Sequence, residues 1–166
     1  FNFIKKTWSI ILSNKQKLIV RLAKIKDLKT IQNFQIQMEH AIEDTPMPDE
    51  VGKKGVNYIL STAPKDGFYL VAEIKDTIIG CLRISYERSV SSNGVFWWIQ
   101  NVFVSEIHQN KGVFQHLYKE VLKMSKSYKN IVGIKLHVNK NNLKAQKAYE
   151  KAGMKKSPEF VYFKRL

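Results

Sequence analysis

The stretch Val102-Phe103-Val104, followed by Gln109-Asn110-Lys111-Gly112-Val113-Phe114, decides how this chain folds. An apolar, β-rich run stops at Val104, a short polar turn follows, and an amphipathic helix begins after Gly112. The first N–H groups of a helix have no partner within the helix and carry the positive end of its dipole. A strand, a turn and a helix start in this order therefore predict a site that binds phosphate.

Periodicity in the rest of the chain predicts alternating strands and helices. The three consecutive strands between residues 68 and 104 should be antiparallel, and the strand–helix–strand step across 95–138 should be parallel with a right-handed crossover. Asp27 is expected to cap the first helix. The fold predicted from this order is a mixed α/β (α+β) sheet. We expect strands at 18–23, 68–74, 77–86, 95–104, 131–138 and 160–163, and helices at 27–38, 49–60, after Gly112 and from Asn142 to Ala152.

Length, charge and cysteine content limit the classes of protein. A chain of 166 residues is most simply one domain, here 17–166, preceded by an N-terminal extension at 1–16. The net charge of +14 favours a phosphate-bearing partner, but most of the basic residues are Lys rather than Arg, so the charge alone names none. The single cysteine, Cys81, excludes an intrachain disulfide and favours a reducing, cytoplasmic location. No apolar run reaches the length of a membrane span.

Two motifs in order resemble the GNAT superfamily of N-acetyltransferases over about residues 17–166. The first is Gln109-Asn110-Lys111-Gly112-Val113-Phe114 after a strand that ends in Val-x-Val. The second is the segment from Asn142 to Met154, which is similar to the family pattern Asn-x-x-Ala-x-x-x-Tyr-x-x-x-Gly-Phe. The resemblance implies a mixed sheet of about six to seven strands flanked by about four helices, with a central parallel strand–helix–strand.

The resemblance also implies acetyl-CoA as acetyl donor and a set of residues that bind it. The turn should hold the pyrophosphate and the strand end should pair with the pantetheine arm. Phe114 stands where the family has Gly or Ala, so its ring must point into the core. The cofactor-binding residues expected from the resemblance are Val102, Phe103, Val104, Gln109, Asn110, Lys111, Gly112, Val113, Phe114, Gln115 and Asn142.

Three residues are candidates for the chemistry. Tyr149 can return a proton to the departing thiolate as a general acid. His137 has a suitable pKa for a general base, with packing at the surface as the competing interpretation. Gln100 stands where many relatives have Glu or His, and it can only orient a water or the substrate. Glu87, at a strand end, is a weaker candidate base. No metal site is expected.

The predicted function is transfer of an acetyl group from acetyl-CoA to a primary amine by direct attack. Two alternatives stay open: a basic nucleic-acid-binding protein, and a CoA-binding regulator of the same fold without catalysis. We expect no specific nucleic acid and no membrane partner under the acetyltransferase interpretation. A homodimer is compatible with the resemblance, and the sequence does not name the acceptor amine.

Overall fold

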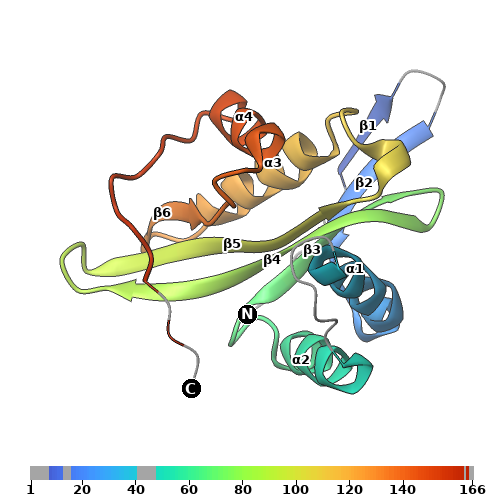
Figure 1. The fold of residues 1–166 in the computed structure, drawn as a ribbon, viewed down its shortest axis with the longest axis horizontal. Helices are drawn as coiled ribbons and strands as arrows, with labels where there is room; N and C mark the ends of the chain where they lie inside the picture. The colour runs from blue at the N-terminus through green and yellow to red at the C-terminus, as the bar shows by residue number, and fades with distance from the viewer. Residues whose placement is uncertain (1–7, 13–15, 41–47, 163, 165–166) are drawn as a thin grey trace.

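The computed structural model describes residues 8–12, 16–40, 48–162 and 164, whose strands form a six-stranded mixed sheet (Figure 1). All neighbouring strands are antiparallel except the last two, which are parallel. The strands lie across the sheet in chain order: β1 (Trp8–Leu12), β2 (Gln16–Leu22), β3 (Phe68–Ile74), β4 (Thr77–Ser89), β5 (Gly94–Val104) and β6 (Ile131–Leu136).

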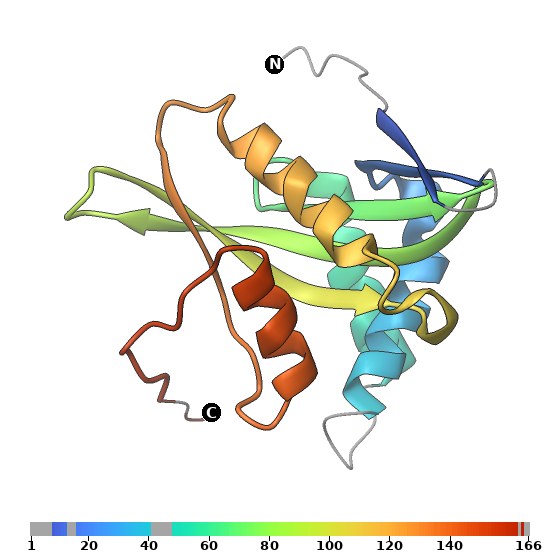
Figure 2. The same cartoon turned by 90° about the horizontal axis from the view of Figure 1, so that it is seen from above.

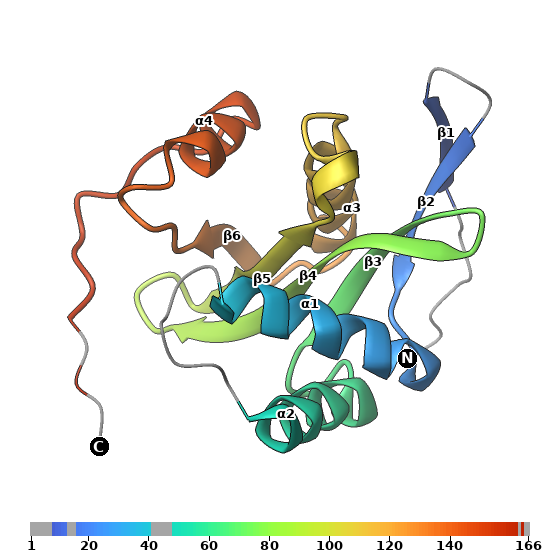
Figure 3. The ribbon, with the colours of Figure 1, turned by 45° about the vertical axis from the view of Figure 1, so that its right-hand side comes forward.

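Two helices cover each face of this sheet (Figure 3). On one face lie α1 (Leu28–His40) and α2 (Asp49–Thr62), and on the other lie α3 (Val113–Ser125) and α4 (Leu143–Lys151). The predicted mixed α/β fold, with its antiparallel β3–β4–β5 and its parallel β5–α3–β6, is confirmed. None of the described helices is long and apolar enough to cross a membrane.

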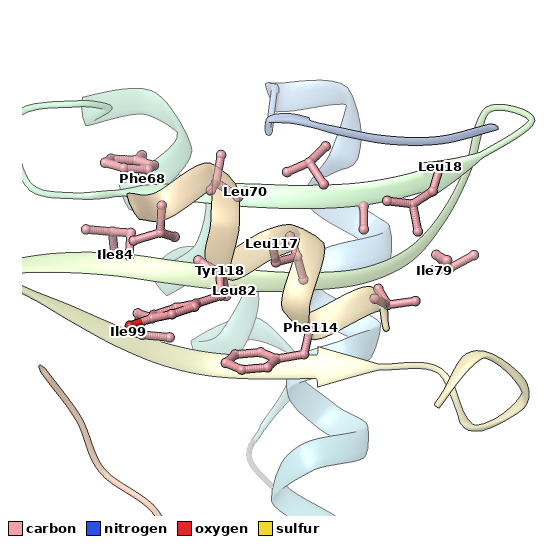
Figure 4. Packing of buried hydrophobic residues seen from close by; sticks show 14 of the residues in the cluster. Leu18, Phe68, Leu70, Ile79, Leu82, Ile84, Ile99, Phe114, Leu117 and Tyr118 are labelled. Carbon is pink, nitrogen blue, oxygen red and sulfur yellow. The ribbon is translucent and has the colours of Figure 1, made fainter. Parts of the chain in front are cut away.

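Strand β3 shows why the sheet needs helices on both sides. All seven of its residues are buried, and alternation of side chains sends every second one to the opposite face. Phe68 and Leu70 pack toward α3, whereas Tyr69 and Val71 pack toward α1 and α2. On the α3 side, Phe114, Leu117 and Tyr118 close the core over the apolar residues of β3 to β5 (Figure 4).

Two local predictions are wrong. Residues 160–162 belong to no strand, so the last predicted strand is not formed in its described part, and their side chains are exposed. Asp27 does not cap α1 as its N-cap residue. A 3-10 turn at Ile25–Asp27 precedes the helix, and the Asp27 carboxylate accepts a hydrogen bond from the N–H of Lys24 at 2.7 Å.

The predicted domain boundary at residue 17 stays a prediction. Strand β1 lies within the predicted N-terminal extension and pairs with β2 from Trp8↔Val20 to Leu12↔Gln16, so this part of the extension joins the sheet.

A partly buried ion-pair network ties β2 and β3 to the start of α1. The guanidinium of Arg21 donates to both oxygens of Asp27, at 2.7 and 3.1 Å, and from Nε to Glu73 at 2.8 Å. Burial alone would raise the pKa of Asp27, but the hydrogen bonds from Arg21 and from the Lys24 N–H outweigh it and hold that pKa below its ordinary value. The network therefore depends on a charged Asp27.

We expect Asp27→Asn to destabilise the fold by about 2–4 kcal/mol, because it leaves the partly buried Arg21 charge with one charged partner fewer. Since folding lowers the pKa of Asp27, its contribution is present at neutral pH and is lost as pH falls below about 4. Urea unfolding at pH 7 and pH 3 measures both effects. Asp76→Asn, in the exposed β3–β4 turn, is the control; equal stability of the two variants at pH 7 would contradict the account.

Candidate active site

Strands β5 and β6 separate halfway along β5. Their parallel pairing runs from Val95↔Ile131 to Ile99↔Leu136 and then stops, while β5 continues to Val104. No described strand lies along this edge of β5 after Ile99, so its backbone groups there can pair with an extended ligand. Figure 2 shows the chain leaving β6 and turning back through α4 beside this part of β5.

Asn101 marks the irregular point of β5. Its φ is +51°, in the left-handed region that Asn tolerates better than most residues. The pairing of β5 with β4 shifts register at the same place, between Cys81 and Arg83. A β-bulge of this kind bends a strand and re-aims its side chains, and here it turns β5 away from β6.

A cleft of about 610 Å³ opens where the strands separate. This volume is in the range of small-molecule sites. Five of the residues predicted from the sequence line it: Gln100, Val102, His137, Asn142 and Tyr149. The other lining residues are Gln35, Met38, Ile99, Asn101, Val138, Asn139 and Asn141.

Tyr149 presents a half-buried phenol from α4. Its ring meets Phe114 of α3 edge-on, with ring centroids 5.0 Å apart, and burial raises its pKa above the ordinary value. Tyr149 therefore carries its proton at neutral pH, as a general acid must. Both ends of helix α4 are capped. At its start, the side chain of Asn142 accepts from the N–H of Ala145 at 3.0 Å. At its end, Gly153 has a φ of +88°, and its N–H donates back to a carbonyl of the helix.

His137 directly follows β6 rather than lying within it, since the strand ends at Leu136. Its exposed ring packs on Trp98, with centroids 4.4 Å apart. Trp97 and Trp98 point to opposite faces of the sheet, and Trp97 is buried in the α3 core. Of the residues that line the cleft, only His137 and Tyr149 have ionisable side chains.

Glu87 is held in an ion pair rather than freely solvated. Its carboxylate accepts from Lys135 Nζ at 3.0 Å and from the indole N–H of Trp98, and these bonds lower its pKa. Such a carboxylate is a poor base. Gln100 accepts from the hydroxyl of Ser85 at 3.1 Å, which leaves its amide N–H₂ to orient a ligand.

The predicted phosphate turn lies at the far end of the same β5 edge. Asn110 and Gly112 have φ of +60° and +78°, and Gly112 precedes the first residue of α3. No carbonyl among the described residues accepts from the backbone N–H groups of Val113, Phe114 or Gln115. Several donors therefore converge on one point, which fits the phosphates of acetyl-CoA.

Gln109 joins this turn to both β5 and α4. Its Nε2 donates to the Val104 carbonyl at 3.0 Å, and its Oε1 accepts from Lys144 Nζ at 2.7 Å. Lys144 thus adds a positive charge from α4 beside the turn, next to that of Lys111. The predicted inward direction of Phe114 is confirmed, since its ring is 8% exposed and stacks on Tyr118.

The side chain of Phe103 packs away from the cleft. It stacks on Phe34 of α1, with ring centroids 4.3 Å apart. Its contribution to a ligand is therefore limited to its backbone.

Sequence reasoning missed Gln35, Asn101 and Lys144. Gln35 is 6% exposed, and its Oε1 accepts from Asn101 Nδ2 at 2.7 Å. A Gln on the apolar stripe of the first helix is the one signal that could have marked it. Among the described residues, no group of three or more His, Cys, Asp or Glu side chains is placed to hold a metal.

Comparisons with known proteins agree with this geometry. The family model described as "Acetyltransferase (GNAT) family" matches residues 31–154. A possible acetyltransferase from Clostridium difficile 630 is 30% identical, with a TM-score of 0.81 over 90% of this chain and 97% of that one. A predicted acetyltransferase from Clostridium acetobutylicum, solved with acetyl-CoA, is 18% identical, with a TM-score of 0.72 over 89% and 96% of the two chains.

A ribosomal-protein-alanine N-acetyltransferase from Brucella melitensis biovar Abortus 2308 shares the fold at 13% identity, with a TM-score of 0.73 over 90% of this chain and 99% of that one. No curated protein sequence matches this chain.

We expect Gly112→Ala to weaken CoA binding about tenfold, because a side chain at φ +78° costs about 1–2 kcal/mol and shifts the N–H groups of the turn. Isothermal titration calorimetry with CoA measures the change. Gly55→Ala in α2 is the matched control, since a Cβ there meets nothing within 4 Å and should leave the affinity unaltered. Wild-type affinity in Gly112→Ala would show that the turn does not hold the phosphates.

Proposed function

The chain belongs to the GNAT family of acetyltransferases, which use acetyl-CoA, and we propose that it moves the acetyl group to a primary amine by direct attack. One observation carries this proposal. The phosphate turn and the cleft with Tyr149 lie at the two ends of one open strand edge, Gln100 to Val104. An extended thioester with phosphates at its far end matches that layout.

The residues present fit the donor along its whole length. The N–H groups of the turn and the charges of Lys111 and Lys144 would hold the phosphates, and the backbone of Val102, Phe103 and Val104 would pair with the pantetheine arm. A backbone N–H of this edge would also polarise the thioester carbonyl. Asn142, whose Oδ1 caps α4, would meet the arm through its Nδ2.

The reaction needs two proton movements besides the bond exchange. The amine nitrogen bonds to the carbonyl carbon and the carbon–sulfur bond breaks, so the thiolate gains a proton and the nitrogen loses one. Tyr149 would supply the first, since burial keeps its phenol protonated. His137 would accept the second, directly or through a water held by Gln100.

Direct attack is favoured because the chain offers no exposed thiol. Cys81 is fully buried under α1 and α2, and burial raises its pKa to about 12. A protonated, inaccessible thiol cannot carry the acetyl group as an intermediate. The single cysteine also supports a cytoplasmic location, because a chain without an intrachain disulfide is typical of a reducing compartment. That the chain forms a homodimer stays a prediction.

Acetyl-CoA at about 100 times its Kd should raise the melting temperature by about 5–10 °C, since binding to the native state then adds about 2.7 kcal/mol. Differential scanning fluorimetry measures this shift. Acetyl-pantetheine, which lacks the nucleotide phosphates, is the control and should stabilise much less. A melting temperature that does not move at millimolar acetyl-CoA would overturn the proposal.

Replacing Tyr149 by Phe should lower kcat about 100-fold while leaving the acetyl-CoA shift in place, because only the proton donor is lost. Steady-state assays of thiol release against a panel of amines measure kcat. The control is Tyr118→Phe, which alters a phenol in the same aromatic stack but outside the cleft. If both variants turn over like the wild type, Tyr149 is a packing residue.

A further inference from the structure

The cleft contains one buried donor without a partner. The side chain of Gln35 is more than nine-tenths buried, and its Nε2 finds no hydrogen-bond acceptor among the described residues. Leaving a buried N–H₂ unpaired costs free energy, so a protein retains such a group mainly where something else pairs with it. Gln35 lies in the wall of the cleft that also holds His137 and Tyr149.

Asn101 fixes which way the Gln35 amide faces. The Nδ2 of Asn101 donates to Gln35 Oε1 at 2.7 Å, so the Nε2 group is turned away from Asn101. Asn101 itself sits in the left-handed region at the bulge of β5, where backbone strain is tolerated only if the surroundings hold it. An unpaired donor and a strained backbone residue thus meet at one point of the cleft wall.

A second unpaired donor lies on the same face of the sheet. Arg83 pairs in register with Gln100, which lines the cleft, and alternation along β4 places Arg83 on the α1 side with Cys81. Its Nε is buried and has no acceptor among the described residues. Arg83 does not line the cleft, however, and its side chain is hydrogen-bonded to the phenol of Tyr69. Of the two buried donors without an acceptor among the described residues, Gln35 Nε2 is therefore the one that belongs to the cleft wall.

We propose that Gln35 donates from Nε2 to a carbonyl oxygen of the acceptor, and so determines its class. This inference rests on the proposed function. The acceptor nitrogen must reach the thioester near Tyr149 while its carbonyl reaches Gln35 across the same cleft. The substrate is therefore an amine with a nearby carbonyl group, as in an amino acid amide or a peptide N-terminus, rather than a simple alkylamine or polyamine. The net charge of +14 also disfavours polycationic acceptors, because it repels them.

The test compares two amines that differ in one group. Alaninamide and isopropylamine carry the same nitrogen on the same carbon, with and without the carbonyl. kcat/KM is measured for both with the wild type, with Gln35→Met and with Gln32→Met. Gln32 is a control on the same helix, because its side chain donates to the Asp49 carbonyl and does not line the cleft. For each variant, the kcat/KM of alaninamide is divided by that of isopropylamine, and the result is divided by the same ratio in the wild type. This comparison cancels the intrinsic reactivity of each amine.

Because the amine of alaninamide is less basic than that of isopropylamine, the quantity compared is the ratio of their kcat/KM values. Gln35→Met should lower this ratio about tenfold from its wild-type value, through a higher KM for alaninamide alone. Gln32→Met should leave the ratio unchanged. The melting temperature of Gln35→Met should equal or exceed that of the wild type, because an unpaired buried donor has been removed and Asn101, being exposed, can turn to water.

Two results would overturn this inference: a ratio of kcat/KM values that is the same in Gln35→Met as in the wild type, or an equal loss for both amines with a lower melting temperature. If the amines are acetylated but the ratio does not change in Gln35→Met, the acetyltransferase function stands and only the role of Gln35 fails. If acetyl-CoA does not bind, the proposed function itself fails.

Discussion

The separation of β5 from β6 is the constraint on which the rest of the site depends. Two parallel strands that stayed paired along their whole length would satisfy each other's backbone groups and leave nothing for a ligand. Here the pairing stops at Ile99↔Leu136, and the bulge at Asn101 bends β5 away. The open edge that results is also the floor of the cleft, so the same distortion supplies both the backbone donors and the space.

Several irregular conformations border this edge. Asn101 has a left-handed backbone, Gln35 has an amide N–H₂ without an acceptor, and Asn110 and Gly112 are also left-handed. All of them border β5 or the turn that follows it. Strand β3, by contrast, is completely buried and alternates cleanly between the two helical layers. A well-packed core can stabilise a strained backbone residue or an unpaired buried donor that would be unfavourable on its own. Such unfavourable features are typical of ligand-binding sites.

The sequence predicted most of the fold because most of its signals are local. The aromatic and β-branched residues of β3, the glycine before α3, and the Asn and Gly that begin and end α4 each determine their own element. The predictions for the last strand and for Asp27 were wrong because both depend on partners outside their own element. Residues 160–162 have the composition of a strand but no neighbour in the sheet among the described residues, and Asp27 is drawn to Arg21 of β2.

The same distinction applies to the site. The sequence was enough to predict Tyr149, Gly112 and the end of β5, because the motif that contains each of them is one uninterrupted stretch of residues. Gln35 and Lys144 act through contacts with β5 and with the turn, which only the folded chain brings together.

Amide hydrogen exchange with and without CoA tests the central claim most directly. The account predicts that CoA slows exchange at the amides of residues 102–104 that face the open edge and at Val113, Phe114 and Gln115, while those of β2 and β3 are unchanged. Binding of CoA that leaves both segments exchanging at their free rates would contradict it.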